Sequence, residues 1–103
     1  MRMGKVIGNV TLGVSDPAYR AGRWLIVSPL SREQLAGVGK DRLSREPSLV
    51  VFDNLGSGRG DWVAFVEGAE AAAPFSFPIP IDAYNVAILE RVNYHPPQNR
   101  QAV

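Results

Sequence analysis

The sequence predicts a small all-β domain, a five-stranded OB-like barrel with one short helix. Apolar and polar residues alternate in several short segments, a period typical of half-buried strands. Glycine, proline and aspartate separate these segments and predict turns. The chain has 103 residues, a length that suits one domain. Closing so small a sheet into a barrel would remove its exposed strand edges, which favours the barrel over an open sheet.

Five segments carry the strand pattern: residues 5–14, 23–30, 48–53, 61–67 and 84–94. In the first, Val6, Val10, Leu12 and Val14 would share one face. The turn at Asp16-Pro17 leads into the second segment, so we expect the first two strands to pair antiparallel. The alanine-rich residues 68–73 predict the short helix.

Two segments lie outside this pattern. Residues 31–47 are polar, carry both signs of charge and predict a surface excursion. Within it, Ser31 and Gln34 have the spacing of a capping box over one helical turn. Residues 95–103 are polar and contain prolines, which predicts a poorly ordered tail. The expected domain is therefore residues 1–94.

The charge balance and the amino-acid composition exclude several classes of function. Eleven basic residues face ten acidic ones, a net charge of +1, so no basic surface predicts binding to nucleic acid or to an anionic membrane. The chain has no cysteine, which excludes disulfides, thiolate metal sites and a cysteine nucleophile. No apolar run approaches the roughly 20 residues that span a bilayer, and no leader segment is expected. These features predict a cytoplasmic protein without a membrane partner.

Catalytic chemistry finds little support in the sequence. His95 is the only histidine, so neither a catalytic triad nor a multi-histidine metal site can be assembled. No spacing singles out an acid–base pair among the candidate carboxylates, which are Asp16, Asp53, Asp61, Asp82 and Glu90. Turn formation explains Asp53 and Asp61. We therefore expect no catalytic residue, no metal and no cofactor.

The strongest local motif is the glycine-rich loop at residues 56–60. Bare backbone N–H groups in such a loop can bind a phosphate. The third glycine, however, comes one residue too early for the dinucleotide-binding fingerprint, and a strand follows instead of a helix. The Lys-Ser/Thr of a P-loop is also absent. The pattern favours a closely packed structural loop, with a phosphate site as the minor alternative.

The segment DNLGSGRGDWV, residues 53–63, resembles the signature of the EutN/CcmL family, the pentameric vertex proteins of bacterial microcompartments. Residues 3–10, 24–27, 80–83 and 86–92 resemble further family segments, in the same order. The chain also departs from the family pattern. Residues 68–72 lack a serine and an arginine that the family has, Ser57 stands where alanine is usual, and the excursion is longer than in compact members.

The resemblance implies a ring homopentamer that closes the five-fold vertices of a polyhedral shell, without a cofactor. It implies hexameric and trimeric shell proteins as partners and a microcompartment shell in the cytoplasm as location. The loop is then expected at a subunit interface or around a five-fold pore; its residues are Gly56, Ser57, Gly58, Arg59, Gly60 and Asp61. Close approach of subunits would explain the alternate glycines.

Two alternatives to the shell protein remain open. OB-type barrels often bind single-stranded nucleic acid, although the basic residues here are scattered rather than interleaved with aromatic ones. A small-ligand or nucleotide-phosphate binder would use the glycine-rich loop instead.

Overall fold

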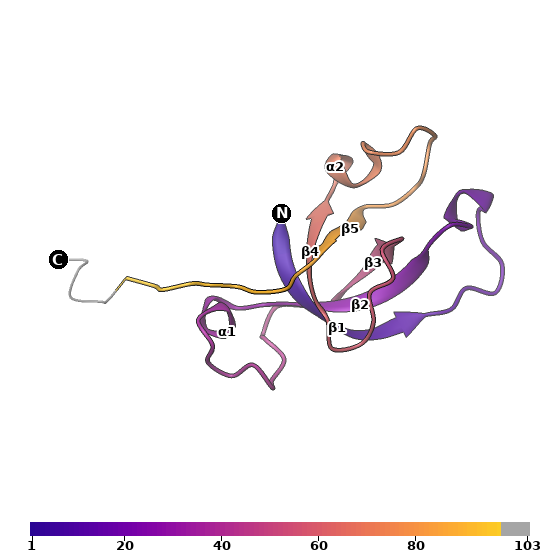
Figure 1. The fold of residues 1–103 in the computed structure, drawn as a ribbon. Coiled ribbons are helices and arrows are strands. Elements are labelled where there is room, and N and C mark those ends of the chain that lie inside the picture. The colour runs from indigo at the N-terminus through magenta and orange to yellow at the C-terminus, as the bar shows by residue number, and fades with distance from the viewer. Residues whose placement is uncertain (98–103) are drawn as a thin grey trace.

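Five strands close into a barrel in the order β1-β2-β3-β5-β4 (Figure 1). The protein was analysed as a computed structural model, which describes residues 1–97. The strands are β1 (Arg2–Val10), β2 (Arg23–Pro29), β3 (Leu49–Asp53), β4 (Trp62–Glu67) and β5 (Ala83–Ile88). Neighbouring strands are antiparallel except β3 and β5, which are parallel. The predicted five-stranded barrel and the antiparallel pairing of the first two strands are confirmed.

Short helical segments connect the strands. The 3-10 turn η1 (Pro17–Tyr19) follows β1, and α1 (Arg32–Leu35) follows β2. The capping box predicted for α1 forms, because Ser31 Oγ accepts from the Gln34 backbone and the Gln34 side chain accepts from the Ser31 backbone. The alanine-rich segment forms α2 (Ala69–Ala72), as predicted. The barrel thus carries two four-residue helices where one was expected.

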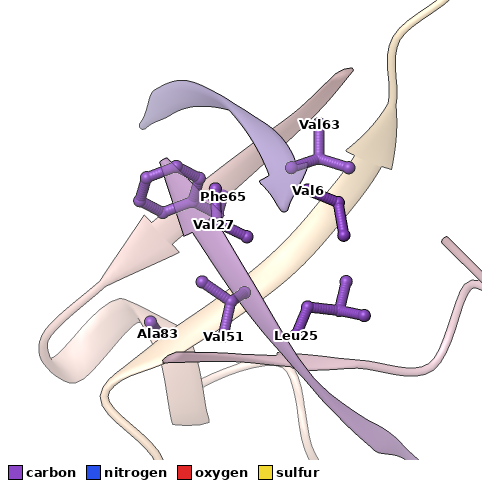
Figure 2. Packing of buried hydrophobic residues seen from close by; sticks show 7 residues of the cluster. All are labelled: Val6, Leu25, Val27, Val51, Val63, Phe65 and Ala83. Carbon is purple, nitrogen blue, oxygen red and sulfur yellow. The ribbon is translucent and has the colours of Figure 1, made fainter. Parts of the chain in front are cut away.

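The barrel interior is filled by apolar side chains from all five strands (Figure 2). The cluster consists of Val6, Leu25, Val27, Val51, Val63, Phe65 and Ala83, each at most 4% exposed. Gly4 on β1 leaves room for this packing, since a Cβ there would lie 2.4 Å from Val27 Cγ1. The single core is consistent with one compact barrel.

The first strand differs from its predicted bounds, since it spans Arg2–Val10 rather than residues 5–14. Its register with β2 shifts between Val6 and Gly8, where two steps on β1 match one step on β2. This bulge interrupts the period of two, so Val10, which pairs with Trp24, no longer shares the core-facing side of Val6. Leu12 and Val14 lie outside the strand and are exposed. The predicted shared face of Val6, Val10, Leu12 and Val14 is therefore wrong.

The last strand is shorter than predicted. It ends at Ile88 rather than at residue 94. Ile88 pairs with Val63, and the Leu89 N–H donates to the Trp62 carbonyl oxygen at 2.7 Å. Because β4 begins at Trp62, the chain beyond Leu89 has no remaining strand to pair with in this barrel.

Most residues of the excursion at residues 31–47 are exposed, and polar contacts organise it. Gln34 is buried, and its Nε2 donates to the carbonyl oxygens of Gly39 and Arg42. The Ser44 hydroxyl donates to the Pro29 carbonyl oxygen, which attaches the end of the excursion to β2. A polar side chain holds this segment together, a role that the apolar pattern of the sequence does not indicate.

Two points remain, on membrane-spanning helices and on the predicted tail. Among residues 1–97, no helix has the length and apolar character needed to cross a membrane. Residues 98–103, which make up most of the tail predicted at residues 95–103, lie outside the described residues.

Candidate functional site

The glycine-rich loop joins β3 to β4 and is attached to a third strand. Asp53 ends β3, and Trp62 begins β4. At the end of the loop, the Gly60 N–H donates to the Val6 carbonyl oxygen and the Val6 N–H donates to the Asp61 carbonyl oxygen, both at 2.9 Å. These bonds fix the loop to β1 as well, so its position is set by the barrel wall.

A buried carboxylate organises the first half of the loop. Asp53 is 1% exposed. Its Oδ2 accepts from the N–H groups of Gly56 at 3.0 Å and Ser57 at 3.1 Å, while its Oδ1 accepts from the Leu55 N–H at 3.3 Å. A buried charge is tolerated only when hydrogen bonds replace water. The loop backbone folds around this carboxylate and supplies that replacement.

Two side chains from other strands complete the network. Asn85 of β5 is fully buried, and its Nδ2 donates to Asp53 Oδ1 at 2.8 Å and to Ser57 Oγ at 2.7 Å. Arg23 of β2 donates from Nη2 to the Ser57 carbonyl oxygen at 2.6 Å and lies 3.9 Å from Asp53 Oδ2. Ser57 itself is fully buried. The Ser57 hydroxyl thus provides an acceptor for Asn85.

The three glycines of the loop differ in whether the backbone conformation requires a glycine. Gly56 and Gly60 have positive φ angles of 88° and 95°, a conformation that side-chain-bearing residues rarely adopt. Gly58 has an ordinary φ, and a Cβ at Gly58 would meet no atom within 4 Å. The backbone of the single chain therefore explains two glycines and leaves Gly58 unexplained.

The second half of the loop is closed by Asp61. Its Oδ2 accepts from the Gly58 N–H at 2.8 Å, and its own N–H donates to the Gly58 carbonyl oxygen at 3.0 Å. The turn roles predicted for Asp53 and Asp61 are thus confirmed. The backbone donors that a phosphate would need are bound to the chain's own carboxylates, and the two negative charges would repel an anion. This geometry disfavours the phosphate site.

The exposed part of the loop presents an apolar side chain, a bare backbone and a cation. Leu55 is 47% exposed, and Gly58 and Arg59 are also exposed. Within residues 1–97, the Arg59 guanidinium has no hydrogen bond or ion pair. Such a rigid, mixed surface is suited to contact with another protein.

The aromatic side chains do not form a platform for nucleic-acid bases. Trp24 packs edge-on against Tyr19 and Phe52, with ring centroids 4.9 and 5.2 Å apart. Phe75 packs in the same cluster against Tyr84 at 4.8 Å. These rings pack against one another, so the faces within this cluster are not free to stack on bases.

The other candidate carboxylates do not gather into a site. Asp16 caps η1, where its Oδ1 accepts from the Ala18 N–H at 2.8 Å, and both Asp82 and Glu90 are exposed. Within the part of the chain that the structure describes, no three metal-ligating side chains lie together. His95 is exposed beyond the last strand.

Sequence reasoning missed Asn85 and Arg23. Asn85 carried a usable signal, because an amide between the apolar residues of a predicted strand must find a hydrogen-bond partner once it is buried. Arg23 carried none, since a cation at the start of a strand is an ordinary surface feature.

Comparison with known proteins gives a consistent result. The family model described as "Ethanolamine utilisation protein EutN/carboxysome" matches residues 1–90. The solved GrpN pentameric microcompartment shell protein from Rhodospirillum rubrum is 27% identical, with a TM-score of 0.71 over 92% of this chain and 100% of that one. No curated protein matches the sequence significantly.

Two further solved structures agree. The pentameric shell protein of the RMM microcompartment is 30% identical, with a TM-score of 0.66 over 86% of this chain and 100% of that one. The CcmL protein of Gloeobacter violaceus is 25% identical, with a TM-score of 0.74 over 91% and 90% of the two chains.

Proposed function

This chain belongs to the EutN/CcmL family, and from that membership we propose that it forms a homopentamer that caps the five-fold vertices of a microcompartment shell. The observation that carries the proposal is the structural match to two pentameric shell proteins, over 92% and 86% of this chain. Its role is structural, as the sequence predicted, and not enzymatic. A closed polyhedron needs corners that flat tiles do not provide, and a ring of five supplies them.

The surface next to the loop supports a ring contact. Four large apolar residues are exposed on β3, on β5 and in the loop between β3 and β4: Val50, Leu55, Val86 and Ile88, at 47%, 47%, 39% and 45%. The elements are neighbours, since β3 pairs with β5 and Asn85 of β5 bonds to Ser57. Burial of these side chains between subunits is favourable. A ring built from one repeated, heterologous contact would repeat that burial five times.

We place the Gly56–Asp61 segment at this subunit interface or around the five-fold axis. Gly58 supports that placement, because no backbone strain or neighbouring atom within the chain requires a glycine there. Close approach of another subunit would require it. Arg59 would then contribute its charge to the interface or to the central opening.

Native mass spectrometry tests both parts of the proposal. We expect the full chain to appear as a pentamer at micromolar concentration, and a clean monomer would overturn the proposed function.

Gly58→Asp should yield a monomer that keeps the circular dichroism of the folded barrel. The matched control is Gly13→Asp, since a Cβ at Gly13 also meets no atom within 4 Å; it should remain pentameric. A pentamer unaffected by Gly58→Asp would refute the placement of the loop.

The remaining partners follow from the same proposal. Hexameric and trimeric shell proteins would border the pentamer, and the shell would lie in the bacterial cytoplasm. Co-expression with such tiles should yield closed particles that contain the pentamer. Equal particle closure without this chain would count against a vertex role.

A further inference from the structure

Beyond the last strand, the chain continues as an extended arm, defined here as residues 89–97. Figure 1 shows it leaving the barrel past α1. Its first residue, Leu89, donates its backbone N–H to the Trp62 carbonyl oxygen at 2.7 Å. Among residues 1–97, no other backbone hydrogen bond involves the arm. The arm therefore carries a run of backbone donors and acceptors that residues 1–97 do not satisfy.

The arm nevertheless has the side-chain pattern of a strand. Val92 and Tyr94 are half-buried, whereas Arg91, Asn93 and His95 are exposed. This period of two is what a strand shows when one of its faces lies on a surface. An extended segment with such a pattern and bare edges is a template for pairing with another chain.

A groove of about 580 Å³ runs beside the arm. Its walls are the arm itself and the start of the excursion, where Leu35 of α1 is half-buried, and the half-buried Trp62 also lines it. The groove thus joins apolar side chains to an unpaired backbone edge. One additional extended segment in this groove would cover these apolar side chains and satisfy the backbone groups of the arm.

We infer that the arm pairs with the backbone of a neighbouring copy of this chain, which also covers the groove between the arm and α1. The inference rests on the proposed pentamer. In a ring, each copy offers the same arm and the same groove to one neighbour, so a single pairing repeated five times closes without leaving a free edge. Glu90 and Arg91 balance each other's charge in the arm, which disfavours a polyanion as the occupant.

Hydrogen exchange on the full chain tests the arm without any substitution. The amides of residues 91–95 should exchange at least about tenfold more slowly in the pentamer than in the Gly58→Asp monomer, because only a neighbour can protect them. Fast exchange of these amides within an intact pentamer would overturn the inference. Absence of a pentamer would instead overturn the proposed function, so the two failures are distinguishable.

Truncation gives a second, independent test. Removal of residues 91–103 keeps the Leu89 bond to β4 and should leave a folded barrel. The protein concentration at which half of the pentamer dissociates should rise by about tenfold or more, because several hydrogen bonds between subunits are lost. The matched control removes only residues 98–103 and should assemble like the full chain. Circular dichroism checks that both variants fold. A pentamer equally stable without residues 91–103 would contradict the inference.

Discussion

Asp53 is the residue on which the glycine-rich loop depends. It is buried, and it accepts hydrogen bonds from three loop N–H groups and from Asn85. Without the carboxylate, the two buried donors, the Ser57 N–H and the Asn85 amide, would lose an acceptor that water cannot replace. The conformation of the loop is therefore tied to a single charged group inside the barrel wall.

Asp53→Asn should destabilise the folded chain by about 1 to 3 kcal/mol, because an amide has one acceptor oxygen and would turn its own NH₂ towards N–H donors. Urea unfolding at a fixed protein concentration measures the change. Asp16→Asn is the matched control, since asparagine caps a helical turn as well as aspartate does. A loss at Asp53 no larger than the loss at Asp16 would contradict the role of the buried carboxylate.

Gly22 is a second residue whose identity follows from packing. A Cβ there would lie 2.2 Å from Phe52 Cζ. Phe52 is 1% exposed and is surrounded by other aromatic rings, so it has little room to move.

Gly22→Ala should therefore cost about 1 to 3 kcal/mol of stability through overpacking. Thermal and urea unfolding measure this loss. Gly13→Ala, where the added Cβ meets no atom within 4 Å, should be neutral or slightly stabilising because it restricts the unfolded chain. Equal effects at the two glycines would show that Phe52 yields to the added methyl group.

Among the secondary-structure elements, the seam between β1 and β4 is held by an ion pair as well as by backbone bonds. Arg2 Nε donates to Glu67 Oε1 at 2.7 Å, and Arg2 Nη2 donates to Glu67 Oε2 at 3.0 Å. These hydrogen bonds, helped by the charge of Arg2 and opposed by desolvation, lower the pKa of Glu67. Both side chains are about 40% exposed, so the pair contributes under about 1 kcal/mol.

The sign of the pH dependence follows from that lowered pKa. The stabilisation is present above the ordinary pKa of the carboxyl group and is lost as the pH falls through the lowered value in the folded chain. Glu67→Gln should therefore reduce the free energy of unfolding at about pH 7 and make no difference near pH 2. Added salt should shrink the difference. A difference that persists in acid would point to packing rather than charge.

The strands show what a sequence pattern can and cannot predict. The second, third and fourth strands were placed to within a residue, because buried apolar runs bounded by turn residues are local signals. The ends of β1 and β5 were wrong for non-local reasons. The bulge at Val6 to Gly8 depends on pairing with β2, and the end of β5 depends on where β4 begins.

The glycine-rich loop was located from the sequence by its composition, and the turn roles of Asp53 and Asp61 followed from their positions. Its anchoring by Asn85 and Arg23 was not predictable, because these residues lie about 30 positions away along the chain and meet the loop only in the closed barrel.

At the scale of the whole molecule, the fixed loop and the unpaired arm are complementary. The loop is held by β1, β2, β3 and β5 and presents a surface that does not need to rearrange on contact. The arm, which forms a single backbone hydrogen bond within residues 1–97, would gain order from a partner. Preorganised surfaces lose little entropy on association, whereas extended segments contribute area and directional bonds. The proposed ring combines both.

The excursion at residues 31–47 has a consequence for how such shells diversify. Its two ends are pinned close together, since Val27 pairs with Leu49 and Ser44 bonds to Pro29. The closure entropy of a loop pinned in this way rises by only about 0.6 kcal/mol for each doubling of its length. Evolution can therefore lengthen, shorten or change the sequence of this segment while the barrel stays intact. A designer could graft a peptide tag or a cargo-recruiting sequence at the same place.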